Sequence, residues 1–264
     1  MEGLKARLLA GREAGLSAPA GLCFWQEDIL VADMDNRRVV RLTPGGEVAP
    51  LGGEPPAMEK PLALAADAAC VWVADAVKKT IWRWRAEEWE KVVSPGSLSP
   101  PLTFPGGLAL SEEGNLYFTD FLTNRLCCRY PGGECGIVGG VDCDKPYGLC
   151  QAHGAMYLTD TARGRILRYA IARKECTVLI DRGEGWNPIA LGAAGDGWLY
   201  ISTGRTLWRF SLQQGGLEKV ADPSSWRAMG LGKLCHLGAI AARPGRVVVS
   251  DTIRHTLTEL TFAR

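Results

Sequence analysis

Short apolar runs separated by polar turn residues follow one another along the whole chain. The first unit has apolar runs at residues 21–25, 29–32, 38–43 and 47–51, with Gln26-Glu27-Asp28 and Pro44-Gly45-Gly46 among the breaks. Runs of this length, bounded by Gly, Pro, Asn and Asp, are typical of β-strands joined by tight turns. The pattern predicts four short strands in each unit.

A Pro-x-Gly/Ala-Leu step marks the start of each unit. It occurs at residues 19–22, 61–64, 105–108, 146–149 and 188–191, and a sixth copy, Leu237-Gly-Ala-Ile240, lacks the proline. The prolines are 42, 44, 41 and 42 residues apart, and Leu237 follows after 49. A period of 40–45 residues with four strands per unit is typical of a β-propeller blade.

A second anchor is an apolar strand that ends in aspartate. Five units contain it, at Asp33, Asp75, Asp120, Asp160 and Asp251, and an aliphatic residue restarts the next strand six positions later. The fifth unit instead has Ile201-Ser202-Thr203 and a turn two residues shorter. Because an active site rarely repeats five times, we interpret this aspartate as a turn residue that accepts backbone N–H bonds and meets an arginine five residues on.

Six units predict an all-β, six-bladed β-propeller of four-stranded antiparallel blades, which forms a single domain over residues 1–264. The sixth unit ends after three strands, at residues 256–262. The run 4–11 precedes the first unit and can supply the missing strand. Closure of the last blade by this N-terminal strand removes an open sheet edge.

Composition narrows the compartment and the class of partner. The formal net charge is +1, so no global field attracts nucleic acid or an anionic membrane. The nine cysteines are odd in number and irregularly spaced, and the first residues lack the apolar core of a signal peptide. We expect a cytoplasmic protein with reduced thiols and no membrane partner.

The repeats resemble the NHL family of propellers. Asp33-Met-Asp-Asn36-Arg37-Arg38-Val39 and Asp120-Phe-Leu-Thr-Asn124-Arg125-Leu126 carry the resemblance, which covers essentially the whole chain. It implies the propeller fold and leaves function open, because NHL-like propellers bind proteins or RNA and are related to lyases and hydrolases.

Two related enzyme families, the gluconolactonase-like and the amidating-lyase propellers, hold metal ions in the channel. In the gluconolactonase-like family an Asn and an Asp bind the metal, and the corresponding positions of this chain are Gly106 and the neighbourhood of Ile189, which offer no such ligand. The amidating lyases use several histidines, and here only His236 lies at the start of an inner strand. A metal site needs three or more converging ligands. The cysteine-rich stretch (Cys127, Cys128, Cys135, Cys143 and Cys150) is distributed over different strands and does not converge. We therefore expect no metal site and no cofactor.

Charge is distributed unevenly between the turns. The turns after the second strands and the connections between blades, which open on one face of a propeller (the top), are rich in Lys and Arg, whereas the opposite turns are comparatively acidic. A surplus of positive charge at this face would attract an anionic partner. We therefore predict a non-enzymatic binding module for an acidic protein surface or a small anionic ligand.

The residues around each first-strand start are the predicted ligand-binding set. They are Lys60, Phe104, Lys145, Tyr147, Asn187 and His236, together with Trp226 from the long connection 222–234, where Trp226 or Met229 is expected to fold over the mouth of the channel near His236. Two alternatives remain open. One is a hydrolase or lyase with His236 as general base and Lys145 as anion stabiliser. The other is binding of single-stranded RNA by stacking on the aromatic residues.

Overall fold

The computed structural model describes residues 4–232 and 234–262, and almost all of its regular structure is β-strand. The strands are β1 (Leu4–Ala10), β2 (Pro19–Trp25), β3 (Asp28–Asp33), β4 (Arg38–Leu42), β5 (Val48–Pro50), β6 (Pro61–Ala66), β7 (Cys70–Asp75), β8 (Thr80–Arg85), β9 (Glu88–Val93), β10 (Pro105–Leu110), β11 (Leu116–Asp120), β12 (Arg125–Arg129), β13 (Cys135–Ile137), β14 (Leu149–Ala152), β15 (Ala155–Asp160), β16 (Arg165–Ala170), β17 (Glu175–Asp181), β18 (Ala190–Ala193), β19 (Trp198–Ser202), β20 (Leu207–Ser211), β21 (Leu217–Ala221), β22 (Leu237–Arg243), β23 (Arg246–Asp251) and β24 (Thr256–Phe262). The helices are the 3-10 turns η1 (Arg12–Ala14) and η2 (Pro95–Ser97) and the α-helix α1 (Pro223–Ala228).

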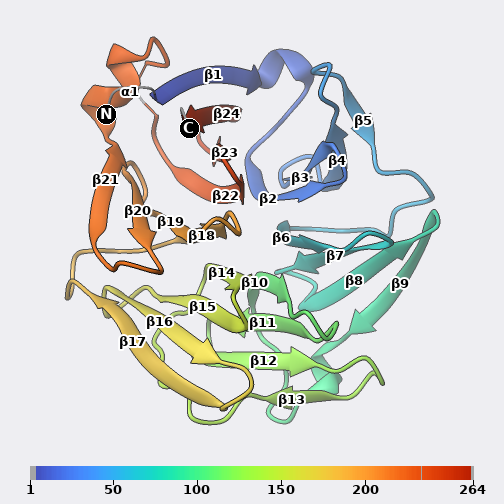
Figure 1. Cartoon of the computed structure of the whole chain (residues 1–264). Coiled ribbons are helices and arrows are strands. Elements are labelled where there is room, and N and C mark those ends of the chain that lie inside the picture. Colours follow the sequence, from blue (N-terminus) through green and yellow to red (C-terminus); the bar gives the residue numbers. More distant parts are fainter. Residues whose placement is uncertain (1–3, 233, 263–264) are drawn as a thin grey trace. The chain divides into compact units, whose positions relative to one another are not determined.

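The strands form six four-stranded antiparallel sheets, as the repeats predict (Figure 1). Burial follows position within a sheet. The second strand β7 is buried at every residue, whereas the fourth strand β9 is buried only at its last two. A strand covered on both faces is apolar throughout, and an outer strand keeps polar residues toward solvent. The sheets belong to two compact units, residues 1–50 with 189–264 (unit 1) and residues 51–188 (unit 2).

Unit 1 contains the closed blade. Its sheets are β2-β3-β4-β5, β18-β19-β20-β21 and β1-β24-β23-β22. Strand β1 pairs antiparallel with β24, with Leu4 opposite Phe262 and Ala10 opposite Leu257, and it flanks β24 at the edge of the sheet (Figure 1). The predicted closure by the N-terminal strand is confirmed.

Residues 223–228 of the long connection in unit 1 form the helix α1. Asp222 caps α1, its carboxylate accepting the N–H groups of Ser224 and Ser225. Trp226 is completely buried in the core of this unit, and its indole N–H donates to the carbonyl oxygen of Arg205 at 3.0 Å. With no exposed surface, Trp226 is a core residue and not a ligand contact, whereas the placement of Met229 over the channel mouth stays a prediction. Met229 is half-buried against the same core.

Unit 2 contains the sheets β6-β7-β8-β9, β10-β11-β12-β13 and β14-β15-β16-β17, and the cysteine-rich stretch lies in it. Cys127 and Cys128 are neighbours on β12, so their side chains point to opposite faces of the sheet. Cys127 packs in one apolar cluster, and Cys128 in another with Cys143. Burial raises the pKa of all three thiols to about 12, which keeps them protonated. These three are core residues.

Two further observations concern the described residues alone. None of their helices has the length and apolar content to span a membrane. Likewise, within residues 4–232 and 234–262 no three His, Cys, Asp or Glu side chains gather in a way that could hold a metal ion.

Candidate ligand-binding site

Buried aspartates position the backbone of the predicted site in unit 2. Asp120 is fully buried, and it accepts the backbone N–H groups of Thr103 (3.1 Å) and Phe104 (2.9 Å). It also accepts the Thr103 hydroxyl at 2.5 Å and pairs with Arg125 at 2.6 Å. Asp75 receives the N–H groups of Glu59 and Lys60 in the same way. The predicted acceptance of backbone N–H groups is confirmed for both aspartates, whereas the predicted arginine partner is present at Asp120 but not at Asp75, where Thr80 stands five residues on.

The pKa of the buried Asp120 carboxyl lies below its ordinary value. Desolvation by itself raises its pKa, but hydrogen bonds from Thr103, Thr123 and Arg125 together hold the pKa below its usual value of 3.8. The carboxylate is therefore charged at neutral pH, and it ties the start of β10 to the turn after β11.

Three aromatic rings gather at this end of unit 2. Phe104 and Phe121 have ring centroids 5.7 Å apart, and Phe121 meets Tyr147 edge-on at 5.8 Å. All three side chains are half-buried, and the next residue, Leu122, is 63% exposed. The structure therefore joins the predicted residues Phe104 and Tyr147 through Phe121. Sequence reasoning missed Phe121, although an aromatic residue directly after the turn aspartate was a visible signal.

The two glycines of the Pro105-Gly106-Gly107 step allow this close packing. A Cβ on Gly107 would lie 2.3 Å from the carbonyl oxygen of Tyr147, and one on Gly106 would lie 3.4 Å from the Tyr147 ring. Thr119 fastens the contact, because its hydroxyl donates to the Tyr147 carbonyl at 3.1 Å and accepts the Gly107 N–H at 2.8 Å. Close packing against Tyr147 therefore explains the two glycines without reference to a ligand.

Two lysines of the predicted set remain available for an anion. Lys60 is half-buried and Lys145 is exposed, and among the described residues neither forms an ion pair. The Lys145 backbone N–H donates to the side-chain oxygen of Asn124 at 2.9 Å, which fixes the chain but leaves the ammonium group unused. Asn187, at the end of unit 2, is exposed.

Most other cations at this end of unit 2 are paired. Arg125 and Arg165 bind the turn aspartates of their own blades, as predicted. Lys78 pairs with Glu59 at 2.6 Å and Arg163 with Asp142 at 2.9 Å. Glu59 and Asp142 lie in the connections between blades, and the expected positive surplus considered only the cations there. Among the described cations at this end, Lys60, Lys79 and Lys145 form no ion pair, and Asp144 directly precedes Lys145, so a positive surplus at this end stays a prediction.

His236 lies in unit 1 and is positioned like Phe104 in unit 2. Its backbone N–H and that of Cys235 donate to the buried Asp251 at 3.2 and 2.6 Å. The side chain is half-buried. Its role as a ligand contact or as a general base with Lys145 stays a prediction, as does the binding role of Asn187.

Comparisons with known proteins agree with the fold. No protein-family model matches the sequence, and no curated protein matches it. Among solved structures, a gluconolactonase from Xanthomonas campestris is 18% identical with a TM-score of 0.75, covering 98% of this chain and 89% of that one. A catalytically inactive virginiamycin B lyase from Staphylococcus aureus, solved with quinupristin, is 13% identical with a TM-score of 0.72, covering 98% and 100%. A chain of a nidogen–laminin complex is 18% identical with a TM-score of 0.69, covering 85% and 84%.

These likenesses extend over nearly the whole chain and define its class: it is a six-bladed β-propeller. At 12–18% identity they establish the fold alone. Membership of the NHL family remains a prediction from the repeat motifs.

Proposed function

We propose that unit 2 is a binding module for an anionic partner, best matched by an acidic protein segment that also carries apolar side chains. The observation that carries this proposal is the row of Phe104, Phe121 and Tyr147, with Lys145 two residues before Tyr147 and Lys60 just before the neighbouring strand β6, both without ion pairs. The exposed Leu122 extends the apolar part of the surface. The likeness to a chain of the nidogen–laminin complex is in keeping with a protein-binding role for this fold.

The chemistry of the row suits recognition of a segment of mixed character. Aromatic rings offer large contact areas at a low entropic cost, and they are enriched at the centres of protein interfaces. Lysines at the rim steer an acidic partner and set its register more than they add affinity. The arginines of these blades cannot replace them, because Arg125 and Arg165 are held by buried aspartates.

The test is affinity capture from the source cell, comparing the wild-type protein with Phe121→Ala and Lys145→Gln. We expect the same partner band to weaken in both variants, and the Lys145→Gln loss to be larger at low salt. Lys174→Gln is the matched control, because Lys174 is exposed in the turn between β16 and β17, at the other end of these strands. Equal capture by all four proteins, each with unchanged thermal stability, would show that this row is not the binding surface.

A second candidate is an enzyme, which the structural likenesses to a gluconolactonase and a virginiamycin B lyase favour. In this reading His236, held at the start of β22 by Asp251, is the general base. Purified protein would be assayed for lactone hydrolysis with and without added divalent metal ions, and His236→Ala would be compared with His153→Ala, an exposed histidine in another turn. Activity lost only in His236→Ala supports the enzyme.

Binding of single-stranded RNA is the third prediction. It would use the same rings and lysines, and its signature is an affinity that falls steeply with salt concentration. Capture that survives ribonuclease treatment separates a protein partner from this alternative.

A further inference from the structure

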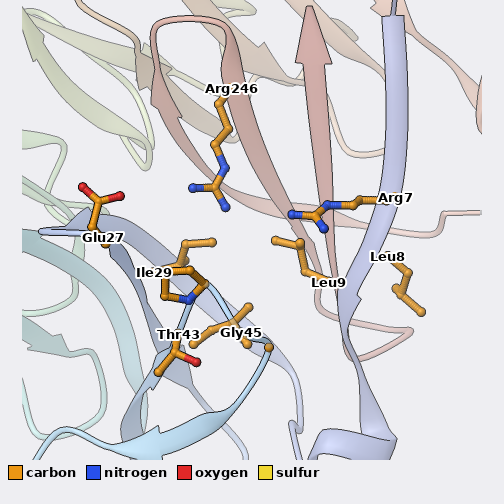
Figure 2. Close-up of a pocket in the computed structure, with 11 residues that line it drawn as sticks. Arg7, Leu8, Leu9, Glu27, Ile29, Thr43, Gly45 and Arg246 are labelled. Atoms are coloured by element: carbon orange, nitrogen blue, oxygen red, sulfur yellow. The ribbon is translucent and has the colours of Figure 1, made fainter.

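Unit 1 contains a cavity that lies apart from the residues discussed so far. It has a volume of about 220 Å³ and lies between β1, the β4–β5 turn and the start of β23 (Figure 2). Its lining combines aliphatic side chains with two arginines; it consists of Arg7, Leu8, Leu9, Glu27, Ile29, Leu42, Thr43, Pro44, Gly45, Gly46 and Arg246. A space of this size is below the usual range for drug-sized ligands and suits a small organic molecule.

The two arginines come from opposite ends of the chain and share one carboxylate. Arg7 and Arg246 each donate from Nε to a different oxygen of Glu259, which is only 5% exposed. One buried negative charge therefore faces two positive charges. The arrangement keeps a net positive charge at the cavity wall, with further N–H donors on each guanidinium.

Glu259 holds this arrangement in place at neutral pH. Burial by itself raises its pKa, but the hydrogen bonds from Arg7 and Arg246 together hold the pKa below its ordinary value. On the other side, the Arg246 guanidinium lies 5.2 Å from the centre of the Phe24 ring. Arg246 is thus held between a carboxylate and an aromatic ring, with part of its charge already taken up by Glu259.

The rest of the lining is apolar or uncharged, apart from one acid. Figure 2 shows the guanidinium groups of Arg7 and Arg246 extending into the same space, with Leu9 and Ile29 below them. Glu27 lies at the far side of the cavity, is largely exposed and pairs with Arg243 at 3.8 Å. Its charge is therefore partly compensated and faces solvent.

We infer that this cavity binds a small organic carboxylate with a short aliphatic body. The carboxylate accepts N–H groups of Arg7 and Arg246 that Glu259 does not use, and the aliphatic body rests mainly on Leu9, with the largely buried Ile29 and Leu42 behind it. Arginine recognises planar anions by paired N–H bonds.

Isothermal titration calorimetry with 4-methylpentanoate tests the inference, and 4-methylpentanamide, its uncharged analogue, is the ligand control. We expect the acid to bind and the amide to bind at least about tenfold more weakly, since a charge-assisted hydrogen bond is lost. Arg7→Gln should weaken binding of the acid about tenfold or more. Arg12→Gln, which removes an exposed arginine just after β1, should bind like the wild type.

Glu259→Gln provides an opposite arm, because it releases both arginines from their shared partner. Binding of 4-methylpentanoate should strengthen several-fold in this variant, and the acid should raise its melting temperature more than that of the wild type. If Glu259→Gln does not fold, Arg7→Gln decides alone, because Arg7 is 66% exposed and its loss leaves the core intact. Equal binding of acid and amide, an unchanged affinity in Arg7→Gln, or no binding of the acid overturns the inference. Lys145→Gln should bind the acid normally, which separates this site from the row in unit 2.

Discussion

The turn between the second and third strands is stabilised differently in the blade β10–β13 and in the blade β18–β21. In the first, Asp120 collects two backbone N–H groups and Arg125 around a buried charge. In the second, Thr203 stands at the corresponding position, and its N–H donates to Thr206 at 3.0 Å to close a shorter turn. The N–H of Ile189 donates directly to the carbonyl oxygen of Ser202 at 2.8 Å.

The difference explains what the repeated aspartate does. The chain enters β10 with the N–H groups of Thr103 and Phe104 in need of acceptors, and the buried Asp120 carboxylate satisfies both at once. In the blade without the aspartate, the carbonyl oxygen of Ser202 accepts the N–H of Ile189 instead. The aspartate therefore serves as an acceptor for buried backbone N–H groups. Its absence from one blade is no sign of a lost active site.

The largest expected difference between the two blades is in the stability lost on Asp120→Ala and on Thr203→Ala. Asp120→Ala leaves Arg125 and the N–H groups of Thr103 and Phe104 without their acceptor, so we expect a loss of about 3–5 kcal/mol in the free energy of unfolding. Thr203→Ala should cost less than about 1 kcal/mol, since it removes only the acceptor of the Trp208 indole N–H. Urea denaturation measures both. Similar losses in the two variants would contradict the comparison.

Asp120 should contribute to the acid dependence of stability in the blade β10–β13. The pKa of Asp120 is lower in the folded state than its usual value of 3.8, so its contribution is complete above that value. The contribution is then lost as the pH falls through the lower folded pKa. In urea midpoints measured between pH 6 and pH 2, Asp120→Asn should show a shallower acid decline than the wild type. An unchanged decline would assign the acid sensitivity to other groups.

The free energy of unfolding that is lost when an arginine partner is removed should increase with the burial of that arginine. Arg125 is 11% exposed and also donates to the carbonyls of Pro100 and Pro101, whereas Arg38 is 45% exposed on Asp33. We expect Arg125→Gln to cost about 2–3 kcal/mol and Arg38→Gln about 1 kcal/mol or less. Denaturation at low and high salt measures the difference, which should persist when surface charge is screened.

The smallest difference between the two blades is expected for a hydroxyl that both of them contain. Thr119 and Ser202 precede the turn in each, and each hydroxyl donates to a carbonyl of the next blade, Tyr147 and Leu237 respectively. Thr119→Val and Ser202→Ala should each cost about 1–2 kcal/mol, because a buried acceptor loses its donor in both. A large difference between these two losses would mean that the blades differ in more than the aspartate.

Three to four residues of each repeat were enough to predict the blades. The Pro-x-Gly/Ala-Leu step and the strand-ending aspartate recur with a constant offset, and strand formation depends on alternation that is local in sequence. The closure of the last blade also followed, because one strand was missing at one end of the chain and one was spare at the other. The placement of Phe104 and Lys60 at first-strand starts rested on the same regularity.

Tertiary structure alone decided which side chains meet. It buried Trp226 in the core, joined Phe104 to Tyr147 through Phe121, and paired Lys78 with Glu59 and Arg163 with Asp142. It also brought Arg7 to Glu259, 252 residues away in sequence. A repeat pattern specifies each strand and its order within a sheet, because these depend on neighbours along the chain. Contacts between blades and across connections depend on side-chain direction and on packing against residues far away in sequence, which no local period encodes.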